Sequence, residues 1–460
     1  MRVTKTQVQS RIQDFQAVEH DTSGQQSAYA GLSVLLPLVK VLDLTRRLRI
    51  ALDEPGRAGA YSTSRLFWLL TLLLMTGWQR LTDLTWFRDD PVVARVAGLK
   101  KMPAPTTMTR QLRSVDEATI AKLDAVREKL VLERLAKEQC SVVTLDADGS
   151  VLSHKGHAEG TAIGFNKVKK GARSYYPLFV TVAQTSQVLK VHHRSGNIHD
   201  SRGALDVLLQ AISDVRGTLP SARLETRQDS AFYSKESANG LEKADVFYTI
   251  SVPFNRSPGL KRLVTERKRW RRIDNTWSFF EVKQKPKGWN RPGRFILIRQ
   301  RHPKQTKEPL QLDLFEPKDH DYRYTVIVTN DWDAPASEVI LRHHGRGSQE
   351  KLFGEAKQHA GLGVLASKYE AFNRIFTLAS VLALNLGREL ELRLTDKRRP
   401  QGLKRAAILP FRSLGTLQRQ LFQRPARLTR PQGRLTLLIG GSVSTFEAVN
   451  DAIQAVRRSA

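Results

Sequence analysis

The sequence predicts an α/β protein in which helices cover both faces of a mixed β-sheet. A β-rich insertion interrupts the sheet, and a helical N-terminal and a basic C-terminal region flank it. Hydrophobic alternation typical of strands begins at residue 141 and continues through three meandering strands. Helices and strands then alternate up to residue 253, where a cationic, β-rich stretch begins. Helical periodicity returns after that stretch.

The N-terminal region, residues 1–140, is predicted to be mainly helical. Apolar residues recur at helical spacing in segments 31–44, 64–84 and 116–137. The longest apolar run, 66–75, is too short to span a bilayer, which needs roughly 20 residues. We expect it to form a buried helix.

A proline-rich turn between two of these segments leads into a further expected helix. Thr106 or Thr107, next to Pro105, can cap this helix. With Thr107 and Arg110 near its start, it resembles the second helix of a helix-turn-helix. An ordinary capped helix explains the same residues equally well. Because the chain is strongly basic, we predict that residues 1–140 bind DNA and that Thr107 and Arg110 contact it.

The first part of the core is predicted at residues 141–253, in the order β-β-β-α-β-α-β. The expected elements are strands at 141–152, 175–184 and 187–194, a helix at 202–215, a strand at 222–228, a helix at 234–243 and a strand at 246–252.

Three further regions complete the predicted organisation. Residues 254–334 form the β-rich insertion, residues 335–395 return to helix and complete the core, and residues 396–460 form the basic C-terminal region. The strands expected in the insertion are 277–284, 294–301 and 322–330.

Acidic residues stand at the ends of two predicted core strands. Asp148 lies near the end of the first strand, and Asp229 directly follows the fourth. These strands are neighbours in a sheet of this order, so the two carboxylates can meet. Glu350 arrives on a helix after the insertion. Such a cluster of oxygen ligands is what a pair of hard divalent cations needs for phosphoryl transfer.

Each carboxylate also has a plainer interpretation. Asp148 can be a turn residue, and Asp146 lies on the same strand face and is equally reachable. Asp229 suits a helix N-cap. Glu350 can be one rung of a salt-bridged helix, where Glu355 is a rival. All three carboxylates occur in the order expected along the chain, and the chain is strongly basic. Together these features favour one common metal site.

The charge of the chain indicates its partners. A net charge of +29 indicates a polyanionic partner, and the usual polyanionic partner is a nucleic-acid backbone. An anionic membrane surface is the competing interpretation. Lys169, Lys170 and Arg173, in the loop after the first strand, are expected to contact phosphates without reading sequence.

Two features of the sequence indicate its compartment. Cys140 is the only cysteine, which excludes an internal disulfide framework and a cysteine-based zinc site. The N-terminal sequence lacks the apolar core of a signal peptide. We therefore predict a cytoplasmic protein that works on the nucleoid.

The residues around Glu350 carry a family resemblance. They follow the spacing His343-x2-Arg346-x3-Glu350-x6-Lys357. This is similar to the Y-(2)-R-(3)-E-(6)-K signature of bacterial insertion-sequence DDE transposases with a β-strand insertion. The segments VVTLDADGS and RQDSAFYS resemble the first-Asp and second-Asp segments of that class. Further segments resemble the insertion sequence thirteen-eighty group, and the resemblance covers about residues 31–440.

The resemblance implies an RNase H-like core and a specific active site. Asp148, Asp229 and Glu350 would be the catalytic, metal-binding triad for Mg2+, with Mn2+ as a substitute and two ions in the site. Arg346 and Lys357 would lie on terminal phosphates. His343 stands where the signature has tyrosine, and it could contact a phosphate in a pH-dependent way.

The resemblance also implies a reaction and its partners. The expected reaction is cut-and-paste transposition: cleavage of double-stranded DNA at the terminal inverted repeats, then strand transfer into target DNA. Two ends held together imply a homodimer in the DNA complex. An aromatic side chain of the insertion could stack on a flipped base and support a hairpin intermediate. Trp270, within RKRWRR, is the favoured candidate over Trp277 and Trp289.

Other functions fit parts of the same pattern. One is a nuclease with this fold that cuts DNA without joining it. Another is a catalytically inactive or domesticated relative that only binds DNA. A membrane-surface protein is the most distant alternative.

Overall fold

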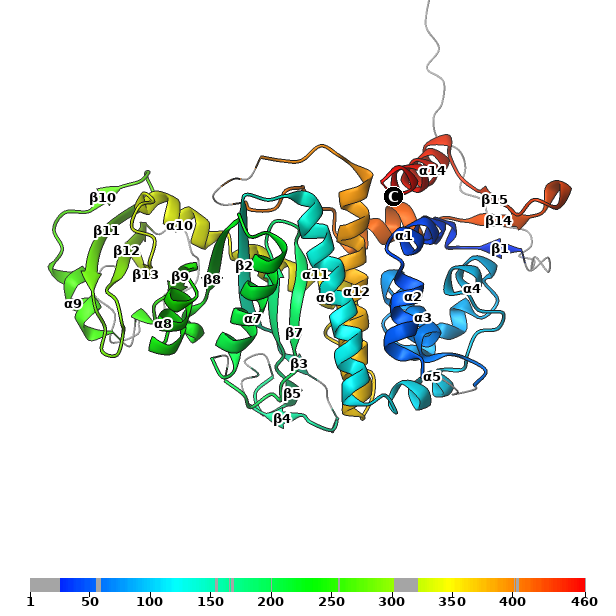
Figure 1. Ribbon diagram of the computed structural model, residues 1–460, viewed down its shortest axis with the longest axis horizontal. Coiled ribbons are helices and arrows are strands. Elements are labelled where there is room, and N and C mark those ends of the chain that lie inside the picture. The colour runs from blue at the N-terminus through cyan, green and yellow to red at the C-terminus, as the bar shows by residue number, and fades with distance from the viewer. Residues whose placement is uncertain are drawn as a thin grey trace, which may run out of the picture.

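A computed structural model of the chain shows an elongated molecule with three parts along its longest axis (Figure 1). A mixed sheet lies in the middle, the strands of the insertion extend from one side of it, and the N-terminal helices stand on the other side. The residues that the structure describes are 25–54, 59–153, 156–164, 166, 169–199, 201–254, 257–301, 322–400, 402 and 405–459.

The core sheet has the predicted mixed topology. Its five strands lie in the order β7-β6-β2-β8-β9, in which β2, β8 and β9 are parallel to one another and β6 and β7 are antiparallel. Their bounds are β2 Val142–Gly149, β6 Leu178–Val182, β7 Gln187–His192, β8 Arg223–Gln228 and β9 Phe247–Ser251. The α/β fold class with a mixed sheet is confirmed.

Helices cover both faces of this sheet. The helices α7 (Ala204–Thr218) and α8 (Lys235–Lys243) pack on one face, where the apolar residues of β2 and β9 point. The helices α11 (Gly347–His359) and α12 (Glu370–Leu394) pack on the other face, over β6 and β7. The helix that carries Glu350 is therefore fixed on the sheet by a buried apolar contact.

The insertion extends the core sheet instead of forming a sheet of its own. Its strand β13 pairs antiparallel with β9, so the order continues as β9-β13-β12-β11-β10. The bounds are β10 Arg271–Arg272, β11 Trp277–Gln284, β12 Gly293–Arg301 and β13 Tyr322–Thr329. The insertion also holds α9 (Pro258–Glu266), and α10 (Ala336–His344) leads back to the core.

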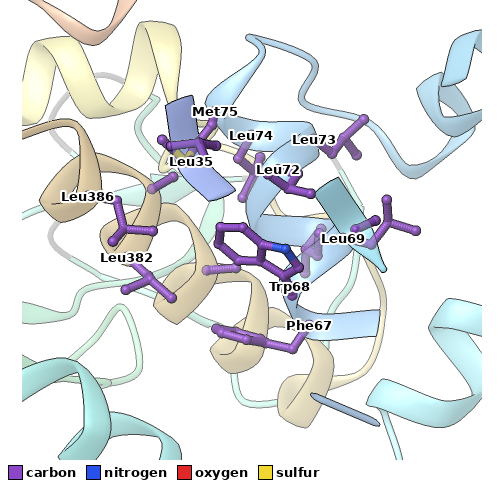
Figure 2. Packing of buried hydrophobic residues seen from close by; sticks show 14 of the residues in the cluster. Leu35, Phe67, Trp68, Leu69, Leu72, Leu73, Leu74, Met75, Leu382 and Leu386 are labelled. Atoms are coloured by element: carbon purple, nitrogen blue, oxygen red, sulfur yellow. The ribbon is translucent and has the colours of Figure 1, made fainter. Parts of the chain in front are cut away.

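The N-terminal region is helical, as predicted. Its α-helices are α1 Leu35–Val41, α2 Leu44–Leu52, α3 Thr63–Met75, α4 Pro91–Ala97, α5 Pro105–Leu112 and α6 Glu117–Glu138. The apolar helix α3 is almost wholly buried, with Trp68 and its neighbours packed between α1 and α12 (Figure 2). No helix in the described part of the chain is long and apolar enough to cross a membrane.

The start of α5 differs from the prediction. Its N-cap is Ala104, no side chain caps it, and Pro105 occupies the first helical turn ahead of Thr106 and Thr107. Proline suits this position because its missing N–H would have no partner there. Neither threonine is therefore the cap.

The two longest helices join the N-terminal region to the core. Helices α6 and α12 lie side by side in the middle of the molecule (Figure 1). Arg134 of α6 pairs with Glu389 of α12 at 2.5 Å, and Arg393 pairs with the same carboxylate at 2.6 Å. All three side chains are buried, so this network fixes the packing of the two helices.

The C-terminal region returns to the N-terminal helices. The strand β14 (Ala426–Thr429) pairs with both β1 (Gln26–Ser27) and β15 (Thr436–Ile439). The short α13 (Leu414–Leu417) precedes this sheet, and α14 (Val443–Arg458) packs on α1 and α12. A second small sheet, β3-β5-β4, follows β2, with bounds β3 Leu152–Ser153, β4 Ala162–Ile163 and β5 Arg173–Tyr175.

Candidate active site

Neighbouring parallel strands place two acidic residues at one edge of the core sheet. In the β2–β8 pair Ala147 lies opposite Gln228, so Asp148 and Asp229 are the next residue on each strand. Adjacent strands lie about 4.8 Å apart, and this register puts the two residues side by side on one face. The Asp148 side chain is 17% exposed, and Asp229 is half-buried. Asp229 also accepts a hydrogen bond from the Ala231 amide, so it acts as an N-cap as well.

Asp146, the rival carboxylate, is engaged in a buried ion pair. Both of its oxygens accept hydrogen bonds of 2.6 Å from Arg227 on the adjacent strand. The two side chains are 1% and 3% exposed. Burial raises the pKa of Asp146, and the Arg227 charge opposes that rise. Asp146 thus links β2 to β8, whereas Asp148 stands at the open end of the strand.

Helix α11 brings Glu350 to the same edge. The preceding residue, Gln349, is buried and donates a hydrogen bond of 2.9 Å from its side-chain amide to the Asp146 carbonyl oxygen. This bond fixes the helix to β2. Glu350 is 64% exposed. Its rival Glu355 pairs with Arg388 at 2.6 Å and accepts a hydrogen bond from the Leu414 amide, so it holds elements of the fold together.

Two cations lie near Asp148, Arg346 at the N-cap of α11 and Lys357 within this helix. Arg346 lies between the acidic residues, with one guanidinium nitrogen 3.4 Å from an Asp148 oxygen and the other 3.3 Å from a Glu350 oxygen. Lys357 is half-buried, and burial lowers its pKa while the Asp148 charge opposes that shift. The predicted spacing thus puts Arg346, Glu350 and Lys357 on the helix face toward Asp148.

His343 lies away from this surface. Its ring is buried, and its two nitrogens lie 2.8 Å from the Ser251 hydroxyl and 3.0 Å from the Thr249 hydroxyl, both on β9. Burial, together with neighbouring positive charges, lowers the pKa of His343 to about 3. The ring is therefore buried against β9, and its contact with a phosphate stays a prediction.

The loop cations divide into two kinds. Lys169 and Lys170 are exposed, so their contact with phosphates stays a prediction. Arg173 is half-buried, and its guanidinium donates hydrogen bonds to the Thr161 carbonyl oxygen at 2.6 Å and to the Thr161 hydroxyl at 3.3 Å. Arg173 therefore holds the small sheet together instead of facing solvent freely.

The candidate base-stacking residue packs against the main hydrophobic core of the sheet. The half-buried Trp270 ring packs edge-on against Phe280, with ring centres 4.7 Å apart, and the Arg299 guanidinium lies 4.7 Å above it. Trp289 is buried, and Trp277 packs against a histidine of α10. Trp332, which no sequence motif singled out, is 47% exposed. The only indication in the sequence that Trp332 is exposed is the polar segment around it.

The predicted DNA contacts of the N-terminal region lie on α5. This helix packs on α3 and buries Met108 and Leu112. Arg110 is exposed and Thr107 is half-buried. Their contact with DNA remains a prediction.

The three carboxylates are ligands of the type that binds divalent metal ions. Asp148, Asp229 and Glu350 supply the carboxylate oxygens that hard cations such as Mg2+ prefer. Within the described ranges, no three His, Cys, Asp or Glu side chains already stand close enough to hold an ion. Arg346 lies between Asp148 and Glu350, so the described conformation keeps the third carboxylate apart.

Comparisons with known proteins agree with the resemblance. The family model described as transposase DDE domain group 1 matches residues 11–460. A cryo-electron microscopy structure of the piggyBac transposase synaptic complex with hairpin DNA is 12% identical, with a TM-score of 0.41 over 85% of this chain and 76% of that chain. A Mos1 transposase paired-end complex is 11% identical, with a TM-score of 0.17 over 43% of this chain and 60% of that chain. No curated protein matches the sequence significantly.

Proposed function

The chain belongs to the family of group 1 transposase DDE domains, and on that premise we propose that it moves a mobile element by cut-and-paste transposition. It cleaves double-stranded DNA at the terminal inverted repeats of its element and transfers the freed strands into target DNA. It acts on the bacterial nucleoid, and within the DNA complex it works as a homodimer that holds two ends together.

One observation carries this proposal. Asp148 and Asp229 occupy equivalent positions at the ends of two adjacent parallel strands, and α11 directs Glu350 toward the same edge through Arg346. Strand ends anchored in a sheet hold carboxylates rigidly, which phosphoryl transfer requires because small displacements at the reacting centre slow it.

In this proposal Asp148, Asp229 and Glu350 hold Mg2+ ions, or Mn2+ as a substitute, most simply as a pair. When bound there, divalent ions would supply activation of the attacking oxygen and stabilisation of the leaving oxygen of the phosphodiester. Cationic and polar residues of the chain bind the DNA. Arg346 and Lys357 bind phosphates beside the cleaved bond, since each is a cation next to Asp148. Lys169, Lys170, Thr107 and Arg110 hold the DNA farther from the reacting bond.

Cleavage and strand transfer on DNA that carries the element's own ends test the proposal. The wild-type protein is compared with Asp148→Asn, Asp229→Asn and Glu350→Gln, in Mg2+ and in Mn2+. We expect the wild type to cut and join, and each variant to bind the ends without doing either. Cutting without joining would indicate a nuclease, and binding without cutting in either metal would indicate an inactive relative.

A further inference from the structure

Arg346 makes a contact that the transposase reaction does not explain. Its guanidinium spans two carboxylates from different elements, at 3.4 Å from Asp148 on β2 and 3.3 Å from Glu350 on α11. Each contact uses a different nitrogen of the guanidinium. The Arg346 side chain is 18% exposed and Asp148 is 17% exposed, so solvent screens their contact incompletely, whereas Glu350 is 64% exposed.

The two carboxylates that Arg346 contacts are those that the proposed function assigns to metal. A divalent cation placed between Asp148 and Glu350 would compete with the guanidinium for the same oxygens, and the two positive charges would repel each other. While Arg346 stays in place, the acidic residues have their charge balanced by the protein itself. Metal binding in this conformation is therefore weakened.

A DNA phosphate offers Arg346 a better partner. Guanidinium groups bind phosphate through two parallel hydrogen bonds, with both geometry and charge matched. An arginine that turns from the carboxylates to a phosphate releases oxygens of both Asp148 and Glu350 at once. It also removes a positive charge from the place where the metal must enter.

We propose that Arg346 is a built-in counter-ion that closes the metal site of the free protein and is withdrawn by a DNA phosphate, so that DNA and metal bind cooperatively. The inference rests on the proposed function, because it takes Asp148 and Glu350 as metal ligands. Coupling between two binding sites is reciprocal. DNA therefore raises the affinity for metal by the same factor by which metal raises the affinity for DNA.

Mn2+ titration of the full-length protein, followed by electron paramagnetic resonance of the free ion, tests the coupling. Each protein is titrated alone and with a saturating duplex that carries one terminal repeat. Arg346→Met removes the cation and keeps much of its volume. Lys351→Met is the matched control, since Lys351 is an exposed cation next to Glu350 on the same helix. Arg346→Lys keeps the charge but loses the two-nitrogen fork.

We expect the wild type to bind Mn2+ weakly alone and more tightly with DNA. Without DNA, Arg346→Met should bind Mn2+ about tenfold more tightly than the wild type, the sum of two partly exposed ion pairs. Its affinity should then change little when DNA is added. Arg346→Lys should lie between the two, and Lys351→Met should behave as the wild type.

Two results would overturn the inference in different ways. If the wild type cuts DNA ends but Arg346→Met binds Mn2+ no more tightly than the wild type without DNA, only the counter-ion role fails. If the wild type binds no Mn2+ at the acidic residues even with DNA, and cuts nothing, the proposed function fails with it.

Discussion

Asp146 and Asp148, which the sequence left as alternatives, have different surroundings in the structure. This difference leads to a specific prediction about their substitution. Asp146→Asn removes one partner of a pair joined by two hydrogen bonds of 2.6 Å, with both side chains at most 3% exposed. Breaking a buried pair from one side leaves an uncompensated charge and costs about 3–5 kcal/mol. Asp148→Asn removes a longer contact of 3.4 Å with Arg346, between two partly exposed side chains, which costs about 1 kcal/mol or less.

Urea denaturation followed by tryptophan fluorescence measures both costs. Asp146→Asn should lower the free energy of unfolding by the larger amount. The double variant Asp146→Asn/Arg227→Met, which removes both charges, should recover part of it. Asp148→Asn should unfold like the wild type and bind DNA ends without cutting them.

Two outcomes would refute this reasoning. A cost below about 1 kcal/mol for Asp146→Asn would mean that this carboxyl is already neutral in the folded protein. Cleavage by Asp148→Asn at the wild-type rate would remove Asp148 from the site.

Three further predictions follow from other contacts. Glu350→Gln should abolish DNA cleavage and leave the free energy of unfolding unchanged. Glu355→Gln should lower the free energy of unfolding by about 1–3 kcal/mol because Glu355 is bonded to Arg388, and cleavage by the folded fraction should persist. The opposite pattern would exchange their roles. The folded-state pKa of His343, about 3, lies below its ordinary 6.5, so only the unfolded chain takes up a proton between these pH values. The contribution of the neutral ring to the free energy of unfolding is therefore complete above pH 6.5. It falls as the pH drops, by about 2 kcal/mol at pH 5. In His343→Gln the free energy of unfolding should lose that part of its dependence between pH 7 and 5, and an unchanged slope would contradict the burial. Lys169→Ala/Lys170→Ala should lower the slope of log affinity against log salt for duplex DNA by about 1.8, and an unchanged slope would exclude phosphate contacts there.

Local patterns in the sequence were sufficient to predict the helices and strands of the core and their order along the chain. The strand at 277–284 was predicted with the bounds it has in the structure, because its ends are marked by charged and turn-forming residues. The pairing of β13 with β9 was not predicted. That pairing joins segments on either side of the insertion, and neither segment carries a local signal for its neighbour.

The same limit applies to the site. Spacing alone put Arg346, Glu350 and Lys357 on one helix face, as helical geometry requires. It did not reveal that Asp146 is occupied by Arg227, because that pair depends on the register between two strands far apart in sequence. It also did not reveal that His343 is buried, because its hydroxyl partners come from β9. Sequence patterns identify a face, but the neighbours that cover it are set by tertiary packing.

The most direct test of the central claim is a change of metal preference at Asp148. Asp148→Cys replaces a hard oxygen ligand by a softer thiolate, which Mn2+ accepts more readily than Mg2+. Cleavage of the element's ends should be lost in Mg2+ and recovered in Mn2+, and Asp146→Cys should show no such recovery. Cleavage by Asp148→Cys in Mg2+ at the wild-type rate would contradict the claim that Asp148 holds the metal.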